Sequence, residues 1–144
     1  MGLLDLFKNR DEKLCKLRDY LVLAFSDQEL SEKEEVVIGA LLKKEKITRT
    51  EFDKVFMDPD MIRDKYPKSD KEKLRYLIQL VALMMCDGEC TEEEIQFCRI
   101  VAMKMGLNPD LVTIAVATIA RNSGNDELIV HAVISYMANK DKVY

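Results

Sequence analysis

Apolar residues recur every three or four positions along most of the chain, and short polar stretches separate the runs. Such spacing places apolar side chains on one face of an α-helix. The two clearest stripes predict helices from about Asp11 to Phe25 and from Ser69 onward. Their apolar positions are Leu14, Leu17, Leu21 and Phe25 in the first, and Leu74, Leu77, Ile78, Val81 and Met85 in the second. The pattern therefore predicts an all-α fold.

At several points a serine or threonine is followed three positions later by a glutamate, and three of these pairs are interpreted as helix starts. This pattern is a capping box, in which the hydroxyl accepts a hydrogen bond from the glutamate amide and the carboxylate accepts one from the amide of the cap residue. The pairs are Ser31 with Glu34, Thr48 with Glu51, and Thr91 with Glu94. We therefore expect helices to start just after residues 31, 48 and 91.

The segment from Leu111 to Ala120 is rich in Val, Ile and Thr, which are common in strands. It follows Asn108-Pro109-Asp110, which favours a helix start with a capping amide, a proline at the first helical position and a carboxylate at the positive end. Gly106 fits the position just after the preceding helix. We therefore predict a helix here rather than a strand.

The chain repeats itself with an offset of 60 residues, so that 13–48 aligns with 73–108 without a gap. The identical pairs are Lys13/Lys73, Leu14/Leu74, Leu17/Leu77, Leu23/Leu83, Asp27/Asp87, Glu29/Glu89, Glu32/Glu92, Glu34/Glu94 and Lys44/Lys104. We predict a multihelical single domain over residues 1–144, built from two three-helix repeats at about 11–57 and 69–121, with a last helix at about 126–138. A pseudo-twofold axis would relate the repeats and pack the first helix against the fourth.

With 144 residues, 48% hydrophobic and 33% charged, the chain has the composition of a globular protein with a core of its own. Its net charge of −4 argues against nucleic-acid binding, which needs a clustered basic face. The apolar runs are shorter than the roughly 20 residues of a membrane span, and Asp5 interrupts the apolar N-terminus. We expect a cytoplasmic protein without direct membrane insertion.

Two acidic turns, residues 26–34 and 86–94, are the candidate metal sites. Calcium and magnesium prefer carboxylate oxygens, and the candidate ligands are Asp27, Glu29, Asp87 and Glu89. The spacing does not match an EF-hand, and each turn precedes a helix N-terminus, whose dipole favours anions. We therefore expect structural caps and a solvated acidic surface. A divalent-cation-binding protein is the alternative function.

Other side chains carry weaker hypotheses. Methionines at helical spacing form either plain core or an adaptable groove for a partner helix; they are Met84, Met85, Met103, Met105 and Met137. A zinc site would need Cys86, Cys90, Cys98 and His131, whose spacing is wrong for zinc, so we expect reduced, mostly buried thiols. The sequence shows no nucleophile–base pair and no phosphate loop, so we expect no enzyme.

The sequence around the second acidic turn resembles the TerB-like family, which is named for tellurite-resistance proteins. The resemblance rests on an apolar helix that ends in an Asp-Gly-Glu turn, on the capping box after it and on the weaker first copy; its central stretch is Met84-Met85-Cys86-Asp87-Gly88-Glu89-Cys90-Thr91-Glu92-Glu93-Glu94. It covers most of the chain from Lys13 onward. It implies a bacterial, cytoplasmic, non-enzymatic helical scaffold that binds an unidentified protein partner in tellurite resistance or a stress response. It leaves homo-oligomerisation open.

Overall fold

The computed structural model describes residues 3–26, 30–86 and 90–121, with side chains from Arg10 onward. Over these ranges it holds six α-helices and one short 3₁₀ helix and contains no strand, which confirms the all-α prediction. The chain divides into two compact units, Met1–Tyr66 and Pro67–Tyr144. Their boundary falls between the two repeats that the sequence predicts.

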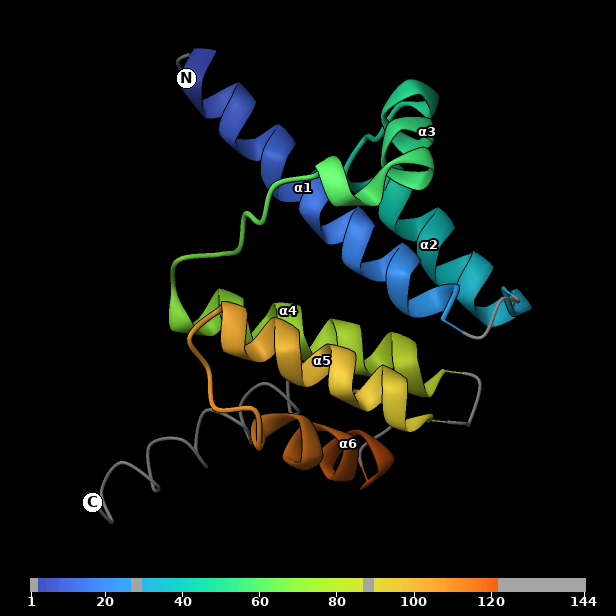
Figure 1. The fold of residues 1–144 in the computed structure, drawn as a ribbon, viewed down its shortest axis with the longest axis vertical. Coiled ribbons are helices and arrows are strands. Elements are labelled where there is room, and N and C mark those ends of the chain that lie inside the picture. The colour runs from blue at the N-terminus through green and yellow to red at the C-terminus, as the bar shows by residue number, and fades with distance from the viewer. Residues whose placement is uncertain (1–2, 27–29, 87–89, 122–144) are drawn as a thin grey trace. The chain divides into compact units, whose positions relative to one another are not determined.

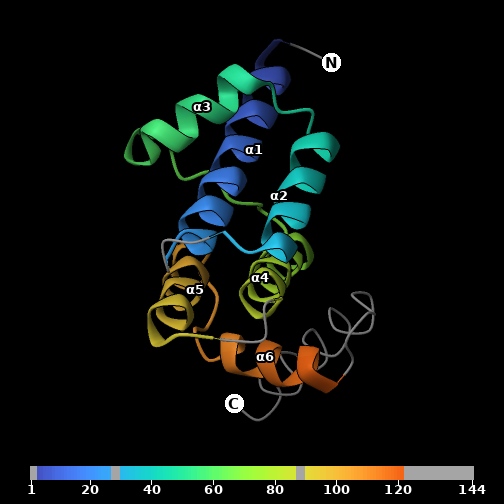
Figure 2. The same ribbon diagram turned by 90° about the vertical axis from the view of Figure 1, so that its right-hand side faces the viewer.

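Unit 1 contains α1 (Leu3–Ala24), α2 (Glu32–Lys44) and α3 (Arg49–Met57), followed by the 3₁₀ helix η1 (Pro59–Met61). α1 and α2 lie side by side in opposite directions, and α1 also packs against α3 (Figure 1, Figure 2). The helix α1 is the centre of this unit because it carries most of the buried apolar residues. Those of unit 1 are Leu14, Cys15, Leu17, Tyr20, Leu21, Leu23, Ala24, Ile38, Leu41, Val55 and Ile62.

Unit 2 contains α4 (Asp70–Met85), α5 (Glu92–Lys104) and α6 (Leu111–Arg121), and each helix contacts the other two. α4 and α5 lie side by side, and α6 crosses the pair (Figure 1, Figure 2). The predicted apolar stripe of α4 is buried except for Met85, which is half-buried. The largest fully buried side chains of this unit are Leu74, Leu77, Ile78, Leu80, Val81, Leu83, Met84 and Val101.

The predicted helix boundaries are close to those observed, with two corrections. α1 begins at Leu3 rather than near Asp11, because no proline or glycine interrupts residues 3–10. α6 begins at Leu111, so Pro109 lies in the preceding turn and not at the first helical position. There the Asp110 amide donates to Asn108 Oδ1 (2.9 Å) and the Leu111 amide to the Asn108 carbonyl (3.0 Å). These two bonds form a separate turn ahead of the helix.

All three capping boxes form as predicted. In the first, the Glu34 amide donates to Ser31 Oγ (3.1 Å) and the Ser31 amide donates to Glu34 Oε1 (3.0 Å). The pairs Thr48–Glu51 and Thr91–Glu94 repeat this arrangement at 2.9–3.2 Å. These bonds satisfy helix N-terminal amides that have no partner within the helix.

The helix α2 and its surroundings recur in α5, sixty positions further along. Both helices follow a capping box, and in both the second residue after the helix has a positive φ, 54° for Lys46 and 78° for Gly106. The next amide then donates to the carbonyl five residues earlier, from Ile47 to Leu42 and from Leu107 to Ala102, each over 2.9 Å. This is the Schellman pattern of helix termination. Local backbone structure therefore repeats between the units, whereas the pseudo-twofold arrangement stays a prediction.

Two further predictions concern the C-terminal helix and membrane insertion. The C-terminal helix predicted at about 126–138 lies outside the described residues. Among the helices that the structure describes, none is long and apolar enough to cross a membrane.

Candidate functional site

The four carboxylates predicted as metal ligands, Asp27, Glu29, Asp87 and Glu89, lie outside the described residues. Within the described ranges, no group of three or more His, Cys, Asp or Glu side chains is arranged to hold a metal ion. Their neighbours Glu34 and Glu94 are buried and accept hydrogen bonds within the capping boxes. The structure therefore assigns two nearby carboxylates to helix caps, and the cation hypothesis stays untested.

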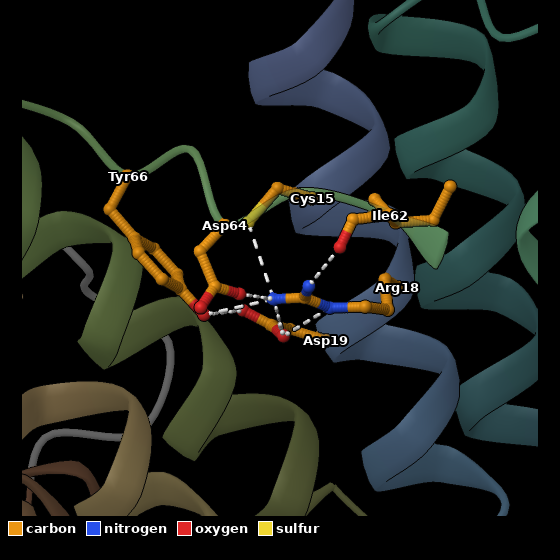
Figure 3. A network of polar contacts seen from close by, with 6 residues as sticks. All are labelled: Cys15, Arg18, Asp19, Ile62, Asp64 and Tyr66. Atoms are coloured by element: carbon orange, nitrogen blue, oxygen red, sulfur yellow. Dashed lines mark hydrogen bonds and ion pairs between the residues drawn. The ribbon is translucent and has the colours of Figure 1, made fainter. Parts of the chain in front are cut away.

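A cluster of polar groups, which we call the Arg18 cluster, joins the middle of α1 to the connector after η1 (Figure 3). Arg18 Nη1 donates to the carbonyl oxygen of Ile62 over 2.8 Å. Arg18 Nη2 donates to Asp64 Oδ1 over 2.6 Å and to the Tyr66 hydroxyl over 3.1 Å. Cys15 completes the cluster, with its sulfur 3.5 Å from Arg18 Nη2. One guanidinium thus binds three positions of the connector.

Asp19 is the buried anion of the Arg18 cluster, with a residue exposure of 1%. Its Oδ1 accepts hydrogen bonds from Arg18 Nε (3.2 Å) and Nη2 (3.1 Å), and its Oδ2 accepts one from the Tyr66 hydroxyl (2.9 Å). A buried carboxylate is stable only when charge and hydrogen bonds compensate it. Arg18 and Tyr66 provide this compensation for Asp19.

The electrostatics of the Arg18 cluster favour the protonated form of Tyr66. Burial lowers the pKa of Arg18, but the Asp19 carboxylate and the hydrogen bond to Asp64 outweigh it, so the pKa is raised above its ordinary value. Burial and then the negative charge of Asp19 raise the pKa of Tyr66. Tyr66 therefore stays protonated at neutral pH and acts as a donor. The Arg18 cluster holds the connector on α1, which is a structural task.

Three phenylalanines form an aromatic surface on unit 1, made of Phe25 at the end of α1 and Phe52 and Phe56 on α3. The rings of Phe25 and Phe56 meet edge to face with centroids 5.5 Å apart, and those of Phe52 and Phe56 stack at 5.9 Å. Phe25 is 38% exposed and Phe56 47%. Exposed rings that are already ordered against each other are typical of protein-binding surfaces, because little conformational entropy is lost when a partner binds.

A groove adjoins the aromatic surface where α2 ends and α3 begins, and we call it the corner groove. Its volume is about 350 Å³, and it is lined by Leu42, Ile47, Thr48, Arg49, Phe52 and Asp53. Leu42, Ile47 and Phe52 are half-buried, so their apolar atoms form the lining while part of each side chain reaches solvent. Phe52 belongs to both features, which makes the groove and the aromatic surface continuous.

The alternative of a methionine groove is wrong for Met84 and Met105. Met84 and Met105 are buried in the core at 1% and 4% exposure, and Met85 is half-buried. Met103 is exposed, and Met137 lies outside the described residues. An apolar helical stripe packs inward by default, and Met84 and Met105 follow that rule.

The cysteines and the histidine show no common site in the described part of the chain. Cys15 and Cys98 are buried, Cys86 is half-buried and Cys90 is exposed. His131 lies outside the described residues. The prediction of mostly buried thiols is thus met at two of the four positions.

Sequence reasoning missed both the Arg18 cluster and the aromatic surface. A signal for the cluster exists, since Arg18 and Asp19 interrupt an otherwise apolar stretch of α1. Their partners Asp64 and Tyr66 lie more than 40 positions away, so the pairing is a tertiary feature. Phe52 and Phe56 are spaced as neighbours on a helix face, but periodicity alone does not tell an exposed face from a buried one.

Comparisons with known proteins add no relative. No family model matches the chain, and neither a curated protein nor a solved structure matches it. The resemblance to the TerB-like family therefore stays a prediction.

Proposed function

We propose that the chain is a non-enzymatic helical scaffold that binds a protein partner through the aromatic surface of unit 1. The observation that carries this proposal is the exposure of Phe25 and Phe56 in an ordered ring cluster. Aromatic anchors supply much of the energy of protein interfaces. A cluster needed only for the core of unit 1 would place these rings inside, as Val55 is placed on the same helix.

The proposal includes the TerB-like resemblance as its cellular context. The Asp-Gly-Glu turn, the capping boxes and the all-helical architecture support membership of that family. The scaffold would then act in the bacterial cytoplasm, in tellurite resistance or another stress response. Growth of cells with and without the gene on tellurite tests this context separately from the binding surface.

The binding surface is tested with a photo-crosslinking amino acid at position 56, and separately at Met103, in the source cells. Met103 is a matched control because it is an exposed apolar residue on a helix of unit 2. We expect one recurring partner adduct from position 56, none from position 103, and loss of the adduct when Phe25→Ser is added. Equal adducts at both positions, or none at position 56, would contradict the proposal.

A further inference from the structure

The chain segment that supplies most of the lining of the corner groove, residues 42–49, is basic, although the chain as a whole is acidic. We call this segment the basic rim; of its cations, Arg49 lines the groove and the lysines belong to the adjoining turn. Residues 42–49 contain four cations and one anion: Lys43, Lys44, Lys46, Arg49 and Glu45. The side chain of Arg49 is 94% exposed, and its Nε is 4.0 Å from Asp53 on the next turn. Asp53 and Glu45 offset two of the four positive charges. The rim therefore keeps a net positive charge of about two, in a chain whose net charge is −4.

The backbone of Lys46 is a second difference between the two units at this helix end. Its φ of 54° lies in the left-handed region, which costs a non-glycine residue on the order of 1 kcal/mol. At the matching position of unit 2, Gly106 adopts a φ of 78° and avoids this strain. The strained position in unit 1 carries one of the rim cations.

Unit 2 shows what the same corner looks like without these features. Sixty positions after Phe52 and Phe56 stand Val112, which is fully buried, and Val116, which is half-buried. Residues 102–109 contain a single cation, Lys104. The same Schellman turn thus forms without a basic rim or exposed rings, although Asn108 and Leu111 stand where unit 1 has the capping box of Thr48 and Glu51. The two features of unit 1 are not needed to build the corner.

We propose that the corner groove binds an acidic amphipathic helix of a partner protein. The inference rests on the proposed function and names the chemistry of its partner. Apolar side chains of the partner, spaced three or four residues apart, would contact Leu42, Ile47 and Phe52. Its carboxylates would face Lys46 and Arg49, which favours acidic partners and rejects basic ones.

The test begins with a selection from a displayed library of random 16-residue peptides against the full chain. We expect the enriched peptides to be acidic and to repeat apolar residues at helical spacing. The binding of one such peptide is then titrated by fluorescence anisotropy against wild type, Arg49→Glu, Lys46→Gly and Lys33→Glu. Reversal of a rim charge should weaken binding about tenfold or more, and added salt should weaken it further.

The variants are chosen so that folding and binding give separate readouts. Arg49→Glu places an anion at the positive end of α3, which favours the helix. Lys46→Gly removes a cation and a strained φ together, so it should raise the melting temperature while it weakens binding. Lys33→Glu makes the same charge change as Arg49→Glu at the opposite end of α2 and should bind like wild type.

Two results would overturn the inference. One is an enriched set without acidic bias; the other is equal affinity for Arg49→Glu and Lys33→Glu. If such peptides still lose binding in Phe56→Ser, the aromatic surface binds partners of another chemistry and the proposed function survives. If no peptide depends on either the rim or Phe56, both proposals fail.

Discussion

Unit 1 is held together partly by charged groups, whereas unit 2 has buried apolar residues at two of the matching positions. In unit 1, Arg18 ties the connector to α1, and Lys13 binds Glu51 of α3 over 3.4 Å. Sixty positions after Arg18 and Glu51 stand Ile78 and Leu111, each 2% exposed. Two similar chain segments thus stabilise equivalent positions by different interactions, which are ion pairs and hydrogen bonds in unit 1 and apolar packing in unit 2. A buried charged group is destabilising when its partner is removed, whereas an apolar core loses stability when a side chain is shortened and leaves a cavity. The stabilities of the two units should therefore respond differently to mutation and pH.

The largest effect is expected from Arg18→Leu. It leaves Asp19 buried without its cation, and removal of one partner of a buried ion pair destabilises by about 3–5 kcal/mol. The free energy of unfolding, measured by urea denaturation, should fall by that amount. The double variant Arg18→Leu with Asp19→Leu removes both charges and should recover part of the loss. A double variant no more stable than Arg18→Leu would show that the uncompensated charge is not the cause.

The matching experiment in unit 2 is Leu111→Ala. Leu111 is buried at the start of α6, so its truncation leaves a cavity and should cost about 3 kcal/mol. Because no charged group is removed, the loss should be equal at about pH 7 and about pH 5. Urea denaturation at both values checks this, and a loss that changes with pH would place a titrating group in the core of unit 2.

The helices were predictable because their signals lie within a few neighbouring residues. The sites were not predictable because they depend on contacts between residues far apart in the sequence. The capping boxes at Ser31, Thr48 and Thr91 lie within four residues of sequence, so sequence alone placed them correctly. The Arg18 cluster joins residues 15–19 to 62–66, and nothing local specifies that contact. The internal repeat gave no signal for these sites, because an alignment of the two copies highlights the residues that they share. The aromatic surface and the basic rim lie where the copies differ.

The acid sensitivity of unit 1 should depend partly on Glu51. Burial raises the pKa of this carboxyl, but the hydrogen bonds at Thr48 and the positive charge of Lys13 outweigh it, so the pKa lies below its ordinary value of 4.5. A lowered pKa means that the folded state binds the proton less tightly than the unfolded chain. The resulting stability is present above the ordinary pKa and is lost as the pH falls through the folded pKa.

Glu51→Gln is the variant that isolates this effect. Glutamine can still complete the capping box, but it cannot form the ion pairs that Glu51 makes with Lys13 and with Arg10, whose Nε lies 3.3 Å from Glu51 Oε2. We expect a loss of about 0.5–1 kcal/mol near neutral pH and a shallower decrease of stability toward low pH than in wild type. Melting temperatures measured over that range check the slope. Parallel curves for the two proteins would show that Glu51 does not contribute to the loss of stability at low pH.

Lys46 and Gly106, the residues with a positive φ, should show smaller changes of stability on substitution, and of opposite sign. Lys46→Gly relieves a left-handed φ and should stabilise the chain by about 0.5–1 kcal/mol. Gly106→Ala imposes the same strain on unit 2 and should destabilise by about 1 kcal/mol. A methyl group at Gly106 would meet no atom within 4 Å, so backbone strain alone is tested there. Thermal melts of both variants check the signs, and effects of the same sign would contradict the shared turn geometry.

The smallest expected effect concerns the acidic turns, where the copies differ by Gly88 against Gln28. If these turns bind divalent cations, Asp87 and Glu89 should dominate, because a glycine lets two nearby carboxylates converge. Calcium or magnesium would then raise the melting temperature by mass action, and Asp87→Asn would abolish the rise. We expect no saturable shift. Each turn precedes a capped helix N-terminus whose dipole opposes a cation, and Glu34 and Glu94 are already engaged in the caps. A saturable stabilisation that depends on Asp87 and not on Asp27 would establish a site in the second turn alone. The carboxylates that both turns share would then not be sufficient for binding, and a Gly88→Gln variant that loses the stabilisation would identify the glycine as the feature that separates them.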